Sequence, residues 1–594
     1  MQFHLFRLRF RRRIRSQKRN VERLSLEAEE QLEERFFKRL NRLVQVRRFI
    51  VVWVVFVLFL LAGVMVQLQA LSGYFQTLQA VPGGIYNEGV VGSFTTANPI
   101  YATSTADVTV AHLLFAGLLK YDDQGKLVPA LAESWSSNDR GTVYTVKLRP
   151  GLTWQDGQPL TAADAVFTFK LIQNPDAQSP LMNGWRNITV AATDARTVTF
   201  TLPGAFSSFP YSLTTGLLPQ HLLASISPSN LRTADFNTVH PVGAGPFAFQ
   251  ALQVSGDTAD TRKEQVAMTP FANYYAGKPK LEQFVIHVYR DQDRLLQDYR
   301  HKELTAVAGL TDVPQDIAQD SSNYVSRFLM AAADMVFFRV SDGVLADTTV
   351  RQALVAASNP AAIVSQLGYQ TPQVVEPLLA GQIGYNPDLA QPTGDVNRAR
   401  SLLDGAGWVV GSNGLRSKDG KALRFTLTAQ DTPEYQQVTT ELQRQWQAIG
   451  VDVKIDLQSS TDLQDTLNSH GYDALLYGIT IGPDPDVFAY WHSSQADVRS
   501  ANRLNFSEYK SATADSALEA GRTRDDPVIR AAKYQPFLKA WQTDAPALGL
   551  YQPQLLYVSH VKVTNLAVTN LAGPADRYAD VQNWLIRQAR VTNQ

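Results

Sequence analysis

The chain has 594 residues, with 55 basic and 55 acidic side chains, 45% hydrophobic and 19% charged residues, and no cysteine. Its length exceeds one ordinary hydrophobic core, so two or more domains are expected, and its composition is that of a globular protein. The lack of cysteine excludes disulfides, thiolate zinc sites and cysteine redox chemistry.

The first 48 residues are strongly basic. They contain fifteen Lys or Arg and six Asp or Glu, so the rest of this neutral chain carries a net charge of −9. Residues 16–48 have the apolar spacing of an amphipathic helix, and residues 7–15 are a basic run suited to anionic lipid headgroups. We expect residues 1–48 to be a cytoplasmic topology signal with a solvated helix; a site for a cytoplasmic partner is the alternative.

An apolar segment follows the basic one. Residues 49–66 are apolar without a charge, and no charged residue occurs before Glu88. About 20 such residues cross a bilayer, and the basic flank favours a cytoplasmic N-terminus. We expect a transmembrane helix at 49–71, a linker at 72–84 and an extracellular or periplasmic remainder. The alternatives are a buried core helix and a cleaved signal peptide, although cleavage after Ala70 or Ala80 would place Leu at the −3 position.

Residues 117–169 combine several local signals. Turns are predicted at 122–125 and 156–157, and residues 143–148 alternate as in a strand. Thr161 and Asp164 have the spacing of a helix cap and its third helical residue. These signals predict a small mixed α/β unit.

The second half has an α/β rhythm. Asp395 is expected to cap a helix ending at Gly405, and a strand at 425–428, a helix at 434–449 and a strand at 451–457 form a βαβ unit. Such a unit favours a right-handed crossover between parallel strands. Ligands of these sheets usually lie beyond the carboxyl ends of the strands, which here points to residues 429–433.

Another strand is predicted at 472–477, followed by the sequence GPDPDVFAYW at 482–491. Several segments now form an ordered set: 85–110, 117–169, 242–247, 273–291, 482–491, 505–509 and 544–551. Together they resemble the family 5 (peptide/nickel-type) extracellular solute-binding proteins of ABC importers, over about residues 85–590. Many members of that family are tethered through an N-terminal cysteine, which this chain lacks, so the apolar helix would provide the anchor.

The resemblance implies an α/β, two-lobed fold of the periplasmic-binding-protein-like type II, large peptide-binder class. Two crossing strands near 330–336 and 552–558 would form the hinge. Lobe one would then comprise 85–331 with 554–594 returning to it, and lobe two would comprise 332–553. The stretch at 117–169 is expected to be peripheral to ligand binding.

The resemblance also suggests ligand contacts in three loops. The candidates are Thr95, Thr96, Asn98, Gln430, Thr432, Asp484, Asp486, Tyr490 and Trp491. A simple turn at 95–98 and a turn with a helix cap at 484–486 are the alternatives. Peptide-binding relatives carry an Asp a few residues before the Asp-Pro pair, and this Asp binds the peptide's free amine. Ile481 and Gly482 occupy the corresponding positions here, so that anchor is absent or is replaced by Asp484 or Asp486.

No catalytic or nucleotide-binding motif is present, and the nine histidines show no metal-binding pair. We therefore expect no enzyme activity, no metal, no cofactor and no nucleic-acid partner. The favoured function is a membrane-anchored receptor with a monomeric outer part, which captures peptides for an ABC permease and its ATPase. A non-transporting peptide or solute sensor with a cytoplasmic partner is the alternative, and an extracellular hydrolase has little support.

Overall fold

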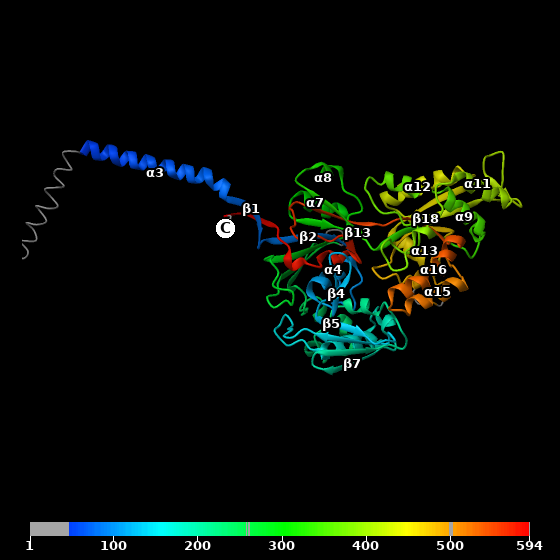
Figure 1. Ribbon diagram of the computed structural model, residues 1–594, viewed down its shortest axis with the longest axis horizontal. Coiled ribbons are helices and arrows are strands. Elements are labelled where there is room, and N and C mark those ends of the chain that lie inside the picture. Colours follow the sequence, from blue (N-terminus) through cyan, green and yellow to red (C-terminus); the bar gives the residue numbers. More distant parts are fainter. Residues whose placement is uncertain (1–46, 257, 259–261, 498–499, 501–502, 593–594) are drawn as a thin grey trace, which may run out of the picture. The chain divides into compact units, whose positions relative to one another are not determined.

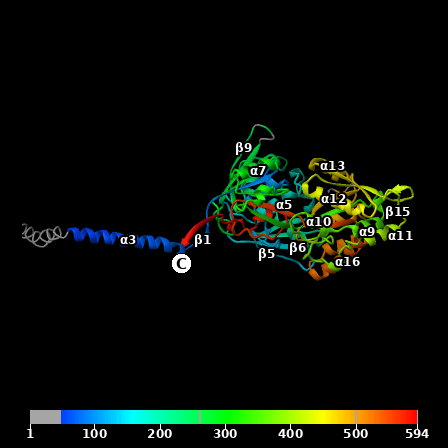
Figure 2. The same ribbon diagram turned by 90° about the horizontal axis from the view of Figure 1, so that it is seen from above.

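The computed structural model describes residues 47–592 except 257, 259–261, 498–499 and 501–502, and it divides into two units (Figures 1 and 2). The first unit comprises residues up to 79 with 588–594, and the second comprises 80–587. The amphipathic helix expected at 16–48 lies outside the described residues, apart from its last two positions.

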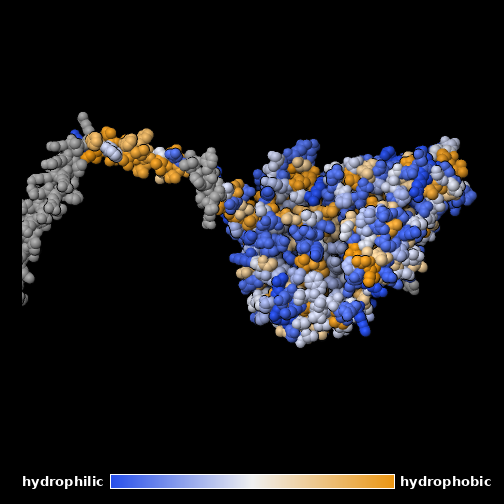
Figure 3. Space-filling model, in the orientation of Figure 1, coloured by the Kyte–Doolittle hydropathy of each residue, from blue (hydrophilic) through white to orange (hydrophobic). Residues whose placement is uncertain are grey.

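The first unit contains helix α3 (Arg47–Phe75) and strand β1 (Gln76–Val81), which pairs with β24 (Arg587–Thr592). Residues Phe49–Gln69 have a mean hydropathy of 3.1, and none of this stretch is buried against protein. Figure 3 shows the exposed apolar surface of α3. The helix is long and apolar enough to cross a membrane. The segment expected as a linker thus contains a strand, whose C-terminal partner no local pattern could indicate.

Lobe one, in the second unit, is built on an eight-stranded sheet with the order β23-β13-β22-β12-β2-β11-β10-β9. Its central strand β2 is parallel to both neighbours. The strands are β2 (Ile85–Val91), β9 (Phe247–Ser255), β10 (Lys263–Pro270), β11 (Gln283–Tyr289), β12 (Ala306–Ala308), β13 (Tyr324–Met330), β22 (Gln554–Ser559) and β23 (Asn570–Leu571).

A four-stranded antiparallel sheet, β5-β6-β8-β7, extends lobe one and lies below the large sheet in Figure 1. Its strands and the neighbouring hairpin are β3 (Leu119–Tyr121), β4 (Leu127–Pro129), β5 (Ala132–Ser137), β6 (Val143–Leu148), β7 (Thr189–Asp194) and β8 (Thr197–Thr201). Helix α5 (Ala162–Gln173) begins where predicted, since the Thr161 N–H donates to Asp164 Oδ2 at 2.9 Å. The predicted small α/β unit is confirmed.

The remaining helices of lobe one are short. They are α4 (Thr105–Leu114), α6 (Gln220–Leu223), α7 (Gln292–Arg300) and α8 (Gln315–Gln319), with 3₁₀ turns that include η4 (Phe209–Thr214) and η10 (Pro574–Tyr578). One large apolar core joins both sheets, and it takes residues from the start and from the end of the chain.

Lobe two is built on a five-stranded sheet with the order β19-β18-β20-β14-β21. Its strands are β14 (Ala332–Phe338), β18 (Arg424–Gln430), β19 (Asp452–Gln458), β20 (Ala474–Thr480) and β21 (Ala547–Tyr551), with a small sheet of β15 (Val409–Val410), β16 (Arg416–Lys418) and β17 (Lys421–Ala422). Its helices are α9 (Thr348–Ala357), α10 (Pro360–Gln366), α11 (Val396–Gly405), α12 (Pro433–Gln447), α13 (Ser460–Ser469), α14 (Phe488–Trp491), α15 (Ala512–Arg522) and α16 (Pro527–Asp544).

The predicted βαβ unit of lobe two is confirmed: β18 pairs in parallel with β19, and α12 connects them. The strand expected at 472–477 starts two residues later and continues to Thr480. Separate apolar cores cover the two faces of the five-stranded sheet.

The chain passes between the two large sheets twice. Met330 ends β13 in one sheet and Ala332 begins β14 in the other, while β21 ends at Tyr551 and β22 begins at Gln554. The crossings contact each other, because Gln552 Nε2 donates to the Met330 carbonyl at 3.1 Å. A short, doubly connected link of this kind permits two lobes to rotate as rigid bodies.

Candidate functional site

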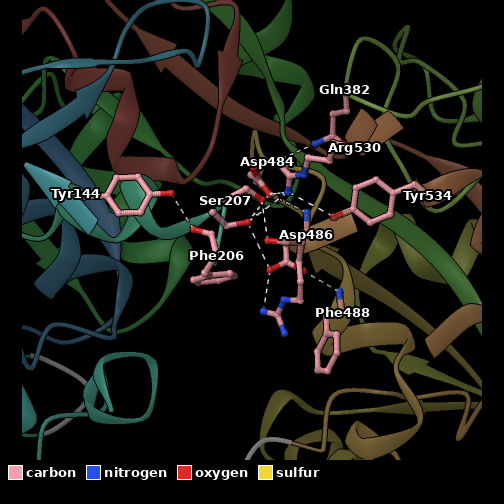
Figure 4. Close-up of polar contacts among 12 residues, drawn as sticks. Tyr144, Phe206, Ser207, Gln382, Asp484, Asp486, Phe488, Arg530 and Tyr534 are labelled. Atoms are coloured by element: carbon pink, nitrogen blue, oxygen red, sulfur yellow. Dashed lines mark hydrogen bonds and ion pairs between the residues drawn. The ribbon is translucent and has the colours of Figure 1, made fainter. Parts of the chain in front are cut away.

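A group of charged side chains joins the two lobes, and we call it the interlobe cluster: Ser208, Asp484, Asp486, Arg522 and Arg530. Arg530 on α16 donates to both carboxylate oxygens of Asp484, at 2.6 and 2.7 Å. Ser208 of lobe one donates its hydroxyl to Asp484 Oδ1 at 2.6 Å (Figure 4). Both oxygens of Asp484 therefore have protein partners.

The second acid of the cluster is also paired. Arg522 Nη2 donates to Asp486 Oδ2 at 2.9 Å, and the Ser207 N–H of lobe one donates to the Arg522 carbonyl at 2.9 Å. Burial raises the pKa of Asp486, Arg522 opposes that rise, and Asp484 adds to it. The Arg522 guanidinium also lies 4.1 Å from the ring centre of Phe488 and 4.8 Å from that of Phe206. The interlobe cluster thus fastens lobe one to lobe two with compensated charges.

The backbone positions this acidic loop. The N–H groups of Ile481 and Gly482 both donate to the Ala331 carbonyl at the first crossing, and Gln382 Nε2 donates to the Gly482 carbonyl at 2.7 Å (Figure 4). Gly482 has a φ of +77°, a conformation that strains residues with a Cβ. The loop is therefore tied to the hinge.

Lobe one contains a cavity of about 240 Å³ beside η4. Its wall is formed by the loop before α4, by α4 itself, by β3, by residues 214–216 and by η10, with Tyr274 and Tyr275 from another loop. The Tyr121 ring on this wall stacks with Tyr211 at 6.3 Å, and beyond the effect of burial the charge of Asp484 helps to raise the pKa of Tyr211. The cavity therefore lies next to the interlobe cluster.

The charged groups of the cavity differ in their partners. The Gly573 N–H donates to Asp576 Oδ2 at 2.6 Å, and burial raises the pKa of Asp576 to about 6 against the effects of Gly573 and Arg577. Lys120 Nζ donates to the Ala579 carbonyl at 2.7 Å and to Asp580 at 3.2 Å. Burial, then Lys120 and Arg577, lowers the pKa of His112 to about 4, so this ring is neutral at physiological pH.

A third polar group lies close to the hinge. Tyr435 donates its hydroxyl to Asp334 Oδ1 at 2.9 Å, and Glu434 accepts from the hydroxyls of Tyr551 at 2.7 Å and Tyr369 at 2.9 Å. Burial raises the pKa of Asp334 to about 7, and the nearby Glu434 adds to the rise. No sequence motif marks these residues, because they come from four separate elements.

The predicted residues at 95–98 lie in the loop that leads to the cavity. Thr95 donates its N–H and its hydroxyl to Asp107, each at 2.7 Å. The hydroxyl of the buried Thr96 accepts the N–H of Asn98, and the fully buried Asn98 donates to Asn237 at 3.0 Å. Their side chains hold the loop in shape, while the next residue, Pro99, lines the cavity.

The predicted residues of lobe two do not gather in one place. Gln430 ends β18, and Thr432 caps α12 by accepting the Tyr435 N–H at 3.2 Å. Tyr490 donates its hydroxyl to the Thr480 carbonyl at 2.8 Å. Trp491 is fully buried against Phe337 and Trp541 and belongs to the core. Among these candidates, Asp484 and Asp486 lie in the interlobe cluster, and none lines the cavity of lobe one.

Sequence reasoning missed the polar side chains of the cavity, namely His112, Lys120, Tyr121 and Asp576. Two of them, Lys120 and Tyr121, belong to the stretch at 117–169 that was expected to be peripheral. A usable signal was the concentration of aromatic and charged residues in segments that the family resemblance already covered.

One group of potential metal ligands occurs among the described residues: Asp298, His301 and Glu303. Lys263 Nζ already contacts Asp298 at 2.6 Å and Glu303 at 3.4 Å. The lysine ammonium occupies the position that a cation would take, so we assign no metal to this group.

Comparison with known proteins gives a consistent result. Residues 126–500 match the family model described as bacterial extracellular solute-binding proteins, family 5 Middle. The oligopeptide-binding protein AppA of Bacillus subtilis is 26% identical over 489 residues, covering 79% of this chain and 86% of that protein.

Two solved structures show the same fold. AppA of Bacillus subtilis in complex with a nonapeptide has a TM-score of 0.67 at 24% identity and covers 86% of this chain and 100% of that one. NikZ of Campylobacter jejuni in complex with Ni(L-His) has a TM-score of 0.71 at 24% identity, covering 84% and 99%. The predicted two-lobed α/β fold is confirmed.

Proposed function

Because the chain belongs to the bacterial extracellular solute-binding proteins of family 5, we propose that it captures peptides between its two lobes and delivers them to an ABC permease and its ATPase. It is a binding protein and not an enzyme, as are its relatives. The similarity to an oligopeptide-binding protein favours peptides as the ligand. The observation that carries the proposal is the cavity of lobe one beside the acidic loop of lobe two.

The dimensions of the cavity suit part of a peptide. Small-molecule sites typically measure about 300 Å³ or more, so about 240 Å³ holds a terminal residue or a side chain while the remaining backbone extends along the lobes. Main-chain hydrogen bonds supply affinity for many sequences. A ligand that contacts both lobes favours the arrangement in which Ser208 reaches Asp484.

The predicted contact residues take two kinds of role in this proposal. Gln430 and Tyr490 are contacts for the part of the ligand on lobe two, and Thr95 is a contact at the edge of the cavity. The other candidates shape the site: Thr96, Asn98, Thr432 and Trp491 through their internal bonds and packing, and Asp484 and Asp486 through the interlobe cluster.

We further propose that α3 spans the membrane, with residues 1–48 in the cytoplasm and the monomeric second unit outside the cell. Lobe one then comprises 85–331 with 554–594, and lobe two comprises 332–553. The exposed apolar helix supports an anchor, and its basic flank supports this orientation.

A second candidate is a sensor that does not transport. The 48-residue basic segment before α3 favours it, because a simple topology signal needs far fewer residues. Deleting residues 2–30 separates the two: transport of peptides is unchanged if the segment is a topology signal, whereas signalling through a cytoplasmic partner is lost.

The test of the proposed function is calorimetry on the full-length protein in detergent micelles with a pool of random hexapeptides. We expect saturable binding, and mass spectrometry of the purified protein should detect bound peptides. Absence of binding together with a copurified ligand of another class would contradict the peptide assignment.

A further inference from the structure

The cavity of lobe one contains a carboxylate that the protein leaves open to a ligand. We propose that Asp576 binds a cationic group of the ligand, which for a peptide is its N-terminal ammonium. This deepens the proposed function and rests on it for the identity of the ligand.

The backbone holds Asp576 with one oxygen fixed and the other open. The carboxylate lies on the cavity wall in η10, where the Gly573 N–H donates to Oδ2 at 2.6 Å. Among the described residues, Oδ1 has no hydrogen-bond partner, and Asp576 forms no ion pair. An ammonium can therefore reach Oδ1 without displacing a protein group.

The nearby cations are already engaged elsewhere. Lys120 Nζ bonds the Ala579 carbonyl and Asp580. The Arg577 guanidinium, which is buried on the far side of η10, donates to Glu88 Oε1 at 3.0 and 2.5 Å. Neither cation is placed to compensate Asp576, which leaves the cavity with an unbalanced negative charge.

Aromatic rings line the same cavity and suit a cation. Tyr121, Tyr274, Tyr275 and Tyr578 are all on its wall. Burial raises the pKa of Tyr121, and Asp576 is the largest charge that adds to this rise, which places the phenol and the carboxylate close together. Tyrosine faces attract ammonium groups, and the attraction is stronger where water is excluded. A carboxylate among tyrosine rings is thus a site for an organic cation.

The main experiment compares Asp576→Asn with wild-type protein, both full length in detergent micelles. Calorimetry uses one random hexapeptide pool with free N-termini and the same pool acetylated. The matched control is Glu282→Gln, which removes one charge from a well-exposed side chain of lobe one outside the cavity.

We expect wild type and the control to bind the free pool about tenfold or more tightly than the acetylated pool, as befits a charged hydrogen bond. Asp576→Asn should lose this preference and retain its affinity for the acetylated pool. Equal binding of both pools by wild type, or a preference that survives in Asp576→Asn, would overturn the inference while the proposed function stands.

A pH series provides a readout that a purely structural role would not change. The pKa of Asp576 is about 6, so the preference for free amines should decrease between about pH 8 and about pH 5. His112, with a pKa of about 4, stays neutral in this range, as does Tyr121, and Lys120 and Arg577 remain in their ion pairs with Asp580 and Glu88. A preference that is constant over this range would contradict the role of Asp576.

A probe that is not a peptide separates the two proposals. Butylamine, with butanol as its uncharged counterpart, should bind wild type and not Asp576→Asn. If neither peptide pool binds but butylamine does so through Asp576, the peptide assignment fails and the cation site stands. Equal binding of butylamine to wild type and Asp576→Asn would overturn the cation site.

Discussion

Asp484 in the interlobe cluster and Asp576 in the cavity of lobe one are both removed from bulk water, yet their surroundings differ. Asp484 has a bidentate arginine and a serine hydroxyl from the opposite lobe. Asp576 has one backbone N–H and an open second oxygen. A compensated carboxylate holds parts of a protein together, whereas an uncompensated one beside a cavity is available to a ligand.

The more conspicuous sequence motif therefore marks the structural acid. Asp484 stands in a Pro-Asp-Pro-Asp run that stands out in the sequence, while Asp576 stands in an unremarkable segment near the C-terminus. The partners decide the role in each case, and those partners come from distant parts of the chain.

Removing the arginine would make Asp484 resemble Asp576. Arg530→Met should destabilise the second unit by about 3–5 kcal/mol, because it leaves a buried carboxylate without its cation. Urea unfolding followed by tryptophan fluorescence measures the loss. The double variant Arg530→Met with Asp484→Leu should recover most of it, and a single variant as stable as wild type would show that the pair carries little stability.

Asp334 provides a third case, a buried carboxylate with neither a cation nor a cavity. Its pKa of about 7 exceeds the unfolded value of about 3.9. The folded state therefore binds the proton more tightly, so stability from this group is present below about pH 4 and is lost as the pH rises through about 7. Asp334→Asn, which keeps an acceptor for Tyr435, should stabilise the protein by about 2–4 kcal/mol at about pH 8.

The same variant should differ little from wild type at about pH 4, where Asp334 is protonated in the folded protein. Thermal unfolding at both pH values tests this. A stability difference that does not vary with pH would mean that Asp334 does not titrate as described.

The smallest effect is expected for the single hydroxyl that joins Asp484 to lobe one. Ser208→Ala should weaken ligand binding by about 1 kcal/mol, roughly fivefold, because it removes one bond of the arrangement in which the lobes meet and leaves Arg530 in place. Calorimetry with the hexapeptide pool measures the change, and Ser229→Ala, on the exposed surface of lobe one, is the control. A loss as large as that of Arg530→Met would show that the serine is not a minor partner.

Local sequence patterns predicted the elements that depend on neighbouring residues. The cap at Thr161, the βαβ unit around α12 and the apolar helix before residue 76 all follow from spacing within a short window. The two-lobed fold followed from an ordered set of resemblances. These features are encoded locally or by family, and they position the site.

The site itself was harder to predict, because its residues are neighbours only after folding. Asp576 reaches the cavity through the returning C-terminal segment, and Arg530 reaches Asp484 from a helix about 45 positions later in the chain. Trp491 shows the opposite error of reasoning from a motif: its place in the motif suggested a contact, whereas full burial makes it part of the core.

Hydrogen–deuterium exchange of the full-length protein, with and without the random hexapeptide pool, tests the central claim most directly. The account predicts that peptide slows exchange in α4, in β3 and around η10 on lobe one, and in residues 482–491 on lobe two. Protection confined to other segments, or peptide binding with no protection around η10, would contradict it.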